Sequence, residues 1–333
     1  MADRLRWGIM ATGGIARQFA NGLKISKTGE LVAVGSRSHE GAAKFTAEFG
    51  GRPHGSYEDL LADPEVDAVY IATPHHMHME NTIAAARAGK GILCEKPFTL
   101  NAYEAEQALA AVNEAGVFFM EAFMYRCAPQ TRKVLEWVRS GAIGRVLQVN
   151  SEFAFHAGKD WANFRADGDV GGGGLMDVGS YCVSFTRLVV GEEPTTCHFV
   201  ADWMDRNYDG SSAGLMKFPG GAVAHFGTGV HVNTRNDARI YGESGQIYVD
   251  DPWKCASGSI QLHRYGHEPE VLQLNLTNDE LYALEADTVA EYFETKSSPY
   301  MTQADTLGQM RTLDALRASA NFTFKAERRP ESQ

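Results

Sequence analysis

The sequence predicts an α/β first half with a doubly wound parallel sheet and an α+β second half with a large, mainly antiparallel, open-faced sheet. Up to residue 121, short apolar runs alternate with amphipathic stretches, which is the pattern of strands joined by helices. After residue 195, apolar runs follow one another with turns such as Pro219-Gly220-Gly221 between them, which is typical of an antiparallel sheet. With 333 residues, the chain is long enough for two domains of roughly 100–200 residues each.

The first half supports this arrangement element by element. Strands are expected at Leu5–Ala11, Glu30–Ser36, Asp67–Ala72, Gly91–Cys94 and Val117–Glu121. Helices are expected at Gly14–Lys24, His39–Phe49, Tyr57–Leu61, Met77–Ala88 and Ala102–Ala115. Right-handed crossovers between parallel strands place such helices on both faces of one sheet. We assign this domain to residues 1–122.

The remaining residues, 123–333, are expected to form a second domain. A helix at Pro129–Ser140 leads into a strand at Arg145–His156, and the glycine run Gly171–Gly174 opens a helical stretch that continues to Val190. Further strands are expected at Thr196–Trp203, Gly214–Phe218, Ala222–Val230, Ala238–Gly242, Gln246–Val249 and Ile260–Arg264. Helices at about Glu280–Phe293 and Ala304–Phe324 close the chain, the last packing back on the first domain, and the polar tail 327–333 is expected to fray.

The composition limits the kinds of partner. The formal net charge of −11 is a poor match for nucleic acid or an anionic membrane, because both attract basic surfaces. No apolar run approaches the ~18 residues of a membrane-spanning helix, and the charged segment Met1–Trp7 does not resemble a signal peptide. The five cysteines are odd in number and form no close pair, which favours free thiols. We expect a cytoplasmic protein with neither nucleic-acid nor membrane partners.

The segment that follows the first strand resembles a phosphate-binding turn. It reads Ala11-Thr12-Gly13-Gly14-Ile15-Ala16, which fits the pattern G-x-G-x-x-G/A except that Ala11 replaces the first glycine. Gly13 keeps the position where the backbone approaches a pyrophosphate, and the next helix would supply N–H groups and a positive dipole end. A turn with no ligand is the alternative, but the position between the first strand and the first helix favours a dinucleotide.

The end of the second strand indicates which dinucleotide. A cofactor with a free ribose 2′-hydroxyl usually meets an Asp or Glu there, about 20 residues after the glycines. This chain has Ser36, Arg37 and Ser38 instead. A guanidinium and a hydroxyl can bind a 2′-phosphate, which a carboxylate would repel. We therefore predict NADP rather than NAD, with a surface arginine that touches no ligand as the alternative.

A lysine follows the strand at Gly91–Cys94. In the sequence Cys94-Glu95-Lys96-Pro97, Lys96 lies at the carboxyl end of a parallel strand, where such sheets bind ligands. Pro97 favours an extended conformation for Lys96. The ammonium group could hold a substrate hydroxyl or polarise a carbonyl, although a strand-end lysine can also be an ordinary surface charge.

Four stretches together resemble the glucose–fructose oxidoreductase, inositol dehydrogenase and rhizopine-catabolism (Gfo/Idh/MocA) family of two-domain dehydrogenases. They are the turn at 11–16, Ala72-Thr73-Pro74 with His78, Cys94-Glu95-Lys96-Pro97, and the glycine-to-tyrosine run 172–181; the run 121–126 with Pro129 adds to them. The resemblance extends over nearly the whole chain. Many members have His where this chain has Tyr181. With tyrosine at this position, the chain resembles a subgroup of the family that includes the dimeric dihydrodiol dehydrogenases and NADP-dependent D-xylose dehydrogenases. Glucose–fructose and aldose–aldose oxidoreductases also belong to this subgroup.

The resemblance implies a catalytic centre in which Lys96 and Tyr181 face the substrate together. A tyrosine phenol could take the proton of a substrate hydroxyl if its pKa fell from the usual value near ~10, and a nearby ammonium favours that change. Asp177 is spaced i, i+4 from Tyr181, on one face of a helix, and could accept substrate hydroxyls. The alternative for Asp177 is a charge that complements the start of the helix. The glycine run would let the backbone pass close to cofactor or substrate.

The expected ligand-binding residues form two overlapping sets. Those for the cofactor are Ala11, Thr12, Gly13, Gly14, Ile15, Ser36, Arg37, Ser38, Thr73, Pro74, His75, His78, Glu95, Lys96, Tyr125 and Arg165. Those for the substrate are Lys96, Arg126, Phe155, Trp161, Asp177 and Tyr181. Aromatic faces stack well on sugar rings, but Phe155, Trp161 and Phe164 could equally belong to the core. No metal is expected, because His75, His76 and His78 have no Cys or carboxylate partner at ligand spacing.

These observations favour an NADP(H)-dependent oxidoreductase that moves a hydride between the nicotinamide and a CH–OH or C=O group of an aldose, a cyclic polyol or a trans-dihydrodiol. One alternative is an aldose–aldose oxidoreductase, in which NADP(H) stays bound while one sugar is oxidised and another reduced. Another is a non-catalytic NADP-binding sensor on the same fold, since fold alone does not decide function. The resemblance also implies a homodimer formed through the sheet of the second domain.

Overall fold

The computed structural model describes residues 4–158, 161 and 163–330. The chain divides into two compact units. The first unit comprises residues 1–99, 103–127 and 277–307, and the second comprises residues 100–102, 128–276 and 308–333. The chain therefore passes between the units several times, and the single boundary between residues 122 and 123 stays a prediction.

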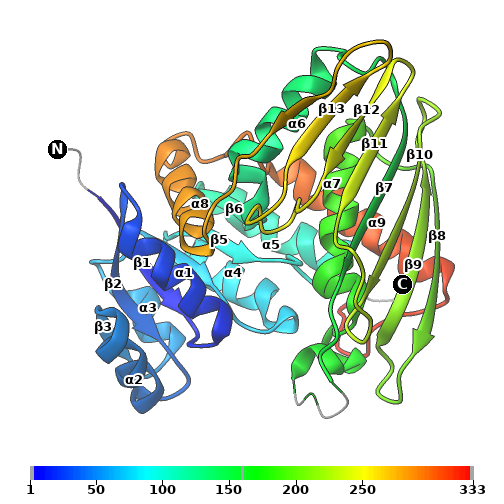
Figure 1. Cartoon of the computed structure of the whole chain (residues 1–333). Helices are drawn as coiled ribbons and strands as arrows, with labels where there is room; N and C mark the ends of the chain where they lie inside the picture. Colours follow the sequence, from blue (N-terminus) through cyan, green and yellow to red (C-terminus); the bar gives the residue numbers. More distant parts are fainter. Residues whose placement is uncertain (1–3, 159–160, 162, 331–333) are drawn as a thin grey trace. The chain divides into compact units, whose positions relative to one another are not determined.

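The first unit is built on a six-stranded parallel sheet in the order β3-β2-β1-β4-β5-β6 (Figure 1). Its strands are β1 (Leu5–Met10), β2 (Gly29–Gly35), β3 (Arg52–His54), β4 (Ala68–Ile71), β5 (Gly91–Glu95) and β6 (Phe119–Ala122). Its helices are α1 (Gly14–Ile25), α2 (His39–Phe49), α3 (Tyr57–Ala62), α4 (His78–Arg87), α5 (Ala102–Ala115) and α8 (Asn278–Tyr292), with 3₁₀ turns at His75–Met77 and Met124–Cys127. This order confirms the predicted doubly wound fold.

The middle of this sheet is buried on both faces. Every residue of β4 and β5 is buried, as expected for parallel strands that carry helices on either side. Phe19 of α1 stacks on Tyr70 of β4 with ring centroids 4.0 Å apart, and Trp7 of β1 meets Phe19 edge-on at 5.1 Å. These aromatic contacts hold α1, and therefore the turn that precedes it, in a fixed position on the sheet.

A helix from late in the sequence completes the first unit. Helix α8 begins with a capping box, in which Thr277 and Glu280 bond each other's backbone N–H groups. It packs closely on α1, because a Cβ atom added to Gly22 would lie 2.6 Å from the Cβ of Tyr282. Asp287 accepts hydrogen bonds from Ser26 Oγ at 2.6 Å and Thr28 Oγ1 at 2.7 Å. It is therefore α8 that joins the first unit, whereas residues 308–319 of the last helix belong to the second.

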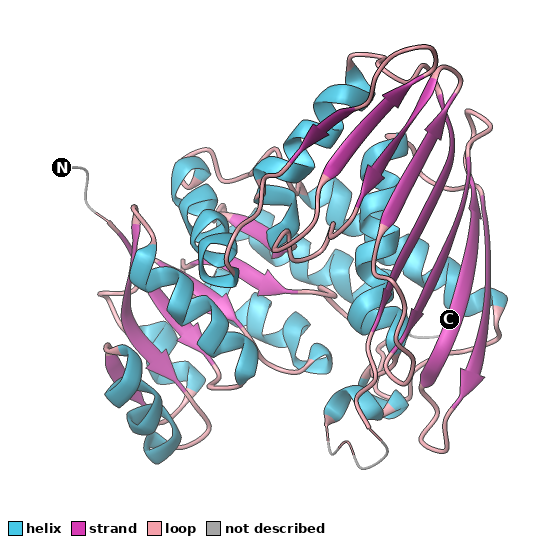
Figure 2. Ribbon diagram, viewed as in Figure 1, coloured by secondary structure: helices cyan, strands magenta, loops and turns pink. Residues whose placement is uncertain are grey.

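The second unit is built on an eight-stranded sheet in the order β14-β13-β12-β11-β7-β10-β9-β8. Figure 2 draws all strands in magenta and all helices in cyan. Its strands are β7 (Val146–Ala154), β8 (Thr196–Trp203), β9 (Asp209–Lys217), β10 (Val223–Gly229), β11 (Ala238–Gly242), β12 (Gly245–Val249), β13 (Ile260–Arg264) and β14 (Glu270–Leu272). Among the described strands of this sheet, only the β7–β10 pair is parallel, which confirms a mainly antiparallel sheet. The helical elements are α6 (Pro129–Arg139), 3₁₀ turns at Phe164–Ala166 and Gly168–Val170, a π-helical turn (Leu175–Gly179), α7 (Ser180–Val190) and most of α9 (Gln303–Ser319).

The two faces of this sheet differ. Residues alternate between buried and exposed along β9 and β10, and helix α7 packs on β7 and β10. On the opposite face, large apolar side chains are exposed: Val200 by 70%, Leu215 by 56% and Val223 by 44%. The sheet is therefore covered by helices on one face and open on the other within this chain, as the sequence predicted.

A few element boundaries differ from the sequence-based expectation. Strand β9 begins at Asp209 rather than Gly214, because small polar residues continue its buried–exposed alternation. Strands β3 and β14 are three-residue edge strands, too short to give a sequence pattern. Helix α9 ends at Ser319 rather than Phe324. In the tail, Glu327 is held by Arg317, which donates from Nη1 at 2.8 Å, so fraying of this residue was a wrong prediction.

Candidate active site

The turn after β1 has the geometry of an anion-binding helix start. Gly13 is the N-cap residue of α1, and no side chain caps this helix and no acidic residue lies in its first turn. A Cβ atom added to Gly13 or Gly14 would meet no atom of the chain within 4 Å. The space before these two glycines is therefore not filled by the protein's own packing, and Thr12 and Ile15 beside them are half-buried. The helix N-terminus is free to bind an anion such as a pyrophosphate.

Ala11 adopts an unusual backbone conformation in the same turn. Its φ is +86°, in the left-handed region that favours glycine, although it carries a Cβ atom. Its N–H donates to the carbonyl of Gly35 at 2.9 Å, so it is tied to the end of β2. The conformation that the first glycine of the pattern would adopt is therefore kept here by an alanine.

The carboxyl end of β2 presents the residues expected at the ribose. Ser36 is half-buried, and Arg37 and Ser38 are exposed. Ser38 is the N-cap of α2, and its hydroxyl accepts from the N–H of Gly41 at 3.2 Å. No described carboxylate forms an ion pair with Arg37, so its guanidinium is available to a phosphate.

The third loop at this edge follows β4, where the strand order of the sheet reverses. Thr73 is buried and accepts from the side-chain amide of Asn81 at 2.9 Å, Pro74 is the N-cap of the 3₁₀ turn, and His75 is buried in that turn. His78 is fully buried, with Nε2 2.7 Å from the carbonyl oxygen of Thr73 and Nδ1 3.0 Å from that of Pro97. Burial lowers the pKa of His78 to about 4, so its neutral ring donates to one carbonyl at a time.

His78 thus links the loop after β4 to the turn that carries Lys96. That turn is held at two further points: the N–H of Lys96 donates to Glu95 Oε2 at 3.2 Å, and the N–H of Phe98 donates to Glu121 Oε1 at 2.9 Å. The Lys96–Pro97 peptide bond is cis. Glu95 also accepts from the hydroxyl of Tyr70. Buried side chains therefore fix the backbone on both sides of the lysine.

Two buried carboxyl groups in this unit were missed at the sequence level. Glu121 is fully buried, and desolvation raises its pKa to about 8. Glu285 of α8 is fully buried and neither of its oxygens has a hydrogen-bond partner; burial, together with the charge of Glu95, raises its pKa well above the usual value. A sequence signal existed for Glu285, because it interrupts the apolar stripe of Leu281 and Val289 at i, i+4 spacing.

Tyr125 and Arg126 are buried in the 3₁₀ turn after β6. The Arg126 guanidinium donates from Nη1 to Asp305 at 2.7 Å and to the carbonyl of Tyr300 at 3.1 Å. Its side chain is only 1% exposed. A direct substrate contact for Arg126 stays a prediction, and the geometry favours a structural ion pair.

In the second unit, Tyr181 lies in the first turn of α7 among aromatic rings. Its ring meets Phe153 of β7 edge-on, with centroids 5.2 Å apart, and Trp253 at 6.1 Å. Trp253 stacks on Phe153 at 5.5 Å, and its indole N–H donates to the carbonyl of Glu152 at 2.8 Å. These contacts fix the orientation of the phenol ring in apolar surroundings.

Asp177 lies within the π-helical turn that precedes α7. The side chain of Arg165 donates from Nε to Asp177 Oδ1 at 2.8 Å, so a residue expected at the cofactor pairs with one expected at the substrate. The i, i+4 spacing from Asp177 to Tyr181 corresponds to one face only in an ordinary α-helix, whereas the turn Leu175–Gly179 is π-helical and wider. Asp177 is the acidic residue in the first turn of this helical segment, so a role at the start of the helix stays open, and Asp209 accepts from the first N–H of the turn, that of Leu175.

Asp209 is the residue in this unit that sequence reasoning missed. It lies 4% exposed at the start of β9, and its Oδ2 accepts from the N–H of Leu175 at 2.7 Å and from Ser212 Oγ at 2.7 Å. Burial raises its pKa to about 7. No sequence signal marked it, because it is separated from the helix it contacts by more than thirty positions along the chain.

The glycine run that opens this helix is closely packed by the chain itself. A Cβ atom added to Gly172 would lie 2.5 Å from the carbonyl oxygen of Arg165, one on Gly173 would lie 2.1 Å from Asp209 Oδ1, and one on Gly174 would lie 2.6 Å from the Cα of Gly229. The expectation that these glycines make room for cofactor or substrate is not needed to explain them. Their own neighbours already require glycine.

Phe155 and Trp161 pack against each other and against a small apolar cluster. Their rings meet edge-on at 5.6 Å, and with Met204 they cover Ala166, Tyr208 and Val230. Both remain half-buried, so each still has surface to offer to a ligand. Their role at a substrate stays a prediction.

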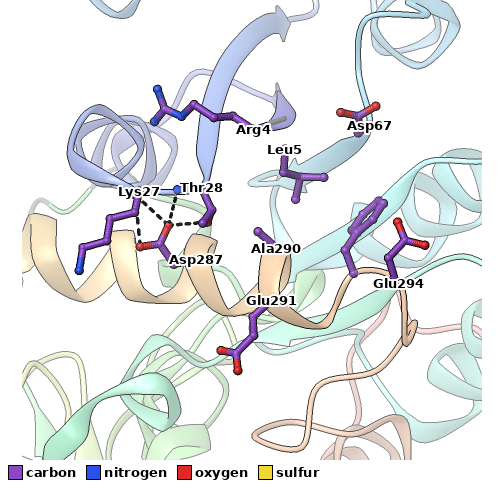
Figure 3. A pocket seen from close by; sticks show the side chains of 10 residues that line it. Arg4, Leu5, Lys27, Thr28, Asp67, Asp287, Ala290, Glu291 and Glu294 are labelled. Atoms are coloured by element: carbon purple, nitrogen blue, oxygen red, sulfur yellow. Dashed lines mark hydrogen bonds between the residues drawn. The ribbon is translucent and has the colours of Figure 1, made fainter. Parts of the chain in front are cut away.

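A pocket of about 680 Å³ lies at the other edge of the first unit's sheet (Figure 3). Leu5 begins β1, Thr28 precedes β2 and Asp67 precedes β4, so these lining residues mark the amino ends of the strands. Asp287 points at the Lys27–Thr28 backbone and is occupied by it. Open parallel sheets bind their ligands at the carboxyl ends, so this pocket is not the dinucleotide site.

In the part of the chain that the structure describes, no group of three or more His, Cys, Asp or Glu side chains could hold a metal ion. All five cysteines are free thiols, as expected. No described helix is long and apolar enough to cross a bilayer.

A doubly wound sheet, an uncapped glycine turn at its first helix and a lysine at a strand end define a class, the NAD(P)-binding oxidoreductases. The chain belongs to the Gfo/Idh/MocA family. Residues 5–123 match the model described as "Oxidoreductase family, NAD-binding Rossmann fold", and residues 131–248 match the "GFO/IDH/MocA C-terminal domain". The resemblance noted in the sequence is confirmed.

Among curated relatives, the chain is 31% identical to a mouse trans-1,2-dihydrobenzene-1,2-diol dehydrogenase, covering 98% of this chain and 99% of that one. It is also 31% identical to a D-xylose 1-dehydrogenase (NADP(+)) of Haloferax volcanii, covering 95% and 97%. Among solved structures, an aldose–aldose oxidoreductase from Caulobacter crescentus is 25% identical with a TM-score of 0.87, covering 96% and 98%. A 3-ketoreductase from Actinomadura kijaniata, in complex with NADP and TDP-benzene, is 29% identical with a TM-score of 0.83, covering 95% and 98%.

Proposed function

We propose that the chain is an NADP(H)-dependent dehydrogenase or reductase that acts on a CH–OH or C=O group of an aldose, cyclic polyol or trans-dihydrodiol. The observation that carries the proposal is the way the two residues are held: buried side chains fix the backbone turn that carries Lys96, and aromatic rings surround Tyr181. The names of the relatives support the substrate classes, since they include a dihydrodiol dehydrogenase and a xylose dehydrogenase. We propose that the two side chains meet at the substrate.

The cofactor fits the residues that the first unit offers. The uncapped start of α1 and the open space before Gly13 and Gly14 suit a pyrophosphate, and the loop Thr73–His75 lies at the strand-order reversal where dinucleotides bind. Exposed Arg37 with Ser36 suits a 2′-phosphate, which favours NADP. The nicotinamide, when bound, accepts or gives the hydride, and the protein supplies position and charge.

Each catalytic side chain has a separate task. In oxidation, the Tyr181 phenolate oxygen takes the proton of the substrate hydroxyl as the carbinol carbon loses its hydride; in reduction, the phenol returns that proton to the carbonyl oxygen. The Lys96 ammonium favours the phenolate and polarises the carbonyl. Asp177, oriented by Arg165, accepts a hydrogen bond from a second substrate hydroxyl. Acid–base assistance of this kind is worth roughly 10²–10⁴-fold.

The test is a screen of aldoses, cyclic polyols and trans-dihydrodiols with NADP⁺ and NAD⁺, read by the absorbance of the reduced nicotinamide. We expect turnover with NADP⁺ that falls by about 10²-fold or more in Lys96→Met and in Tyr181→Phe. Arg37→Ala should raise the KM for NADP⁺ but not for NAD⁺. Unchanged turnover of every accepted substrate in Lys96→Met would refute the catalytic assignment.

One alternative has support of its own. The fold and 25% identity shared with an aldose–aldose oxidoreductase favour a second possibility, in which NADP(H) stays bound while two sugars react in turn. Gel filtration of the purified protein decides between them. Cofactor that co-elutes with the protein and supports sugar-to-sugar transfer favours the alternative, whereas cofactor that is lost and must be supplied favours the dehydrogenase.

We also propose a homodimer formed through the open face of the second unit's sheet. Val200, Leu215 and Val223 project from β8, β9 and β10 on that face, and exposed apolar residues gathered on one surface suit a protein interface. Sedimentation equilibrium should give twice the chain mass of 36.4 kDa, and Leu215→Glu should return it to the monomer. A wild-type protein that sediments only at 36.4 kDa would refute the dimer.

A further inference from the structure

The helix that carries Tyr181 begins against a buried carboxylate. Residues 174–190 form one continuous helical segment, π-helical at Leu175–Gly179 and α-helical after it. Asp209 Oδ2 accepts from the N–H of Leu175 at 2.7 Å, at the first turn of this segment. A carboxylate at a helix N-terminus satisfies an N–H group that has no partner within the helix and lies at the positive end of the dipole.

The carboxylate itself is held rigidly. Asp209 is the first residue of β9, which pairs with β8 on one side and β10 on the other. Its Oδ2 also accepts from Ser212 Oγ at 2.7 Å, which fixes the rotation of the carboxylate. The Oγ1 of Thr228 on β10 donates to the carbonyl of Gly174 at 3.1 Å, a second bond between the sheet and the same helix start. The sheet thus determines where the helix begins.

The other side of the carboxylate explains the glycine before the helix. Gly173 has φ +111°, and a Cβ atom there would lie 2.1 Å from Asp209 Oδ1. The N–H of Asp177 donates to the carbonyl of Gly173 at 3.1 Å, so the chain at Gly173 leads directly into the turn that carries Asp177. Only a residue without a side chain lets the carboxylate approach this closely.

We propose that Asp209 is a positioning residue, which fixes the start of the helical segment and thereby the placement of Asp177 and Tyr181. This inference rests on the proposed function, in which these two side chains contact the substrate. Asp209 touches neither substrate nor cofactor. Its buried carboxyl acts through the N–H of Leu175, six positions before Tyr181, and it therefore controls geometry rather than chemistry.

The experiment compares Asp209→Asn and Asp209→Ala with wild type, using the best substrate of the screen. Misplacement of a catalytic group by about 1 Å can lower the rate by ~10²-fold. We therefore expect kcat to fall about 10²-fold in Asp209→Ala. In Asp209→Asn, which keeps one acceptor oxygen, we expect kcat to fall about tenfold. The KM for NADP⁺ should stay within about twofold, because the first unit binds the dinucleotide. Asp205→Asn, which removes the same charge from an exposed position nearby, should keep wild-type kcat.

A double-mutant cycle separates positioning from an independent effect. If Asp209 acts through Tyr181, adding Asp209→Asn to Tyr181→Phe should lower kcat by less than about twofold further. The inference would be overturned if the double variant lost kcat by the full product of the two single losses. A wild-type kcat in Asp209→Asn would also overturn it. Near-ultraviolet circular dichroism checks folding. If Asp209→Ala fails to fold, the variants Asp209→Asn and Ser212→Ala decide the question. Ser212→Ala frees the carboxylate of Asp209 to rotate and should lower kcat by a few-fold.

The two proposals fail differently. If Tyr181→Phe retains full turnover, the proposed function is wrong whatever Asp209 does. If Tyr181→Phe abolishes turnover while Asp209→Asn keeps it, the proposed function stands and only the positioning inference is refuted.

Discussion

Each unit contains a helix that starts at a glycine-rich turn. The N–H groups at these two helix starts are treated in opposite ways. Helix α1 starts at Gly13 with no side-chain cap, and the space before Gly13 and Gly14 is open. The helical segment 174–190 starts against Asp209, and its glycines are pressed onto the carboxylate and neighbouring backbone. One helix start is open to an anion from outside, and the other is satisfied by a carboxyl oxygen of the chain itself. Similar glycine content in a sequence therefore does not reveal whether a turn is for ligand or for packing.

The largest expected effect is at the closed turn. Gly173→Ala adds a left-handed backbone penalty of about 1–2 kcal/mol to a clash with Asp209 worth about 1–3 kcal/mol. We expect the free energy of unfolding to fall by about 3 kcal/mol in urea denaturation. The matched control is Gly221→Ala, which has φ +89° but its nearest contact at 3.7 Å, and should lose only about 1 kcal/mol. Equal losses in both variants would show that the contact with Asp209 carries no cost.

The carboxylate of the closed turn should give the stability a pH dependence. The folded-state pKa of Asp209, about 7, lies above its ordinary value of 3.8, so the folded chain keeps a proton that the unfolded chain releases. The stabilisation from this group is complete below pH 3.8 and is lost as pH rises through about 7. The free energy of unfolding of Asp209→Asn should therefore fall less steeply with rising pH than that of wild type. The difference in slope should reach about 1 kcal/mol per pH unit in that range. Parallel stability–pH profiles for the variant and wild type would contradict this.

The open turn should respond to ligand rather than to packing. A Cβ atom in Gly13→Ala meets no atom of the chain but occupies space that a pyrophosphate would use. We expect unchanged stability without ligand and roughly tenfold weaker NADP binding, equivalent to about 1.4 kcal/mol. Thermal unfolding with and without NADP measures both quantities. Wild-type NADP affinity in Gly13→Ala would place the dinucleotide elsewhere.

The smallest effect is expected at Ala11. Because its φ is +86°, Ala11→Gly removes a left-handed strain of about 1 kcal/mol and should raise the free energy of unfolding by somewhat less, since glycine is also more flexible in the unfolded chain. Chemical denaturation without cofactor measures this change. A loss of stability in Ala11→Gly would show that the methyl group packs usefully in the turn.

The sequence predicted those parts of the molecule that depend on local pattern. The alternation of apolar and amphipathic stretches predicted the parallel sheet, and the local pattern also predicted that the turn at 11–16 and Lys96 follow the ends of strands. These features are readable because strand ends and helix starts lie next to each other along the chain.

The parts that were missed depend on contacts between distant segments. Asp209 and Glu121 bind backbone N–H groups that are far from them in sequence, so no spacing rule identifies them. The π-helical turn at Leu175–Gly179 follows a glycine run that the sheet approaches closely, and no side-chain pattern in the sequence indicates it. The ion pair between Arg126 and Asp305 likewise forms only when α9, which carries Asp305, is in place.

The return of α8 to the first unit means that a dinucleotide-binding module cannot be cut from this chain as one continuous piece. A fragment that ended at residue 127 would leave Gly22 facing water where Tyr282 should lie, and the loop around Thr28 would lose the carboxylate of Asp287. Exchanging the first unit between relatives would therefore require the exchange of two separate stretches of the gene, because the residues of each stretch pack against those of the other.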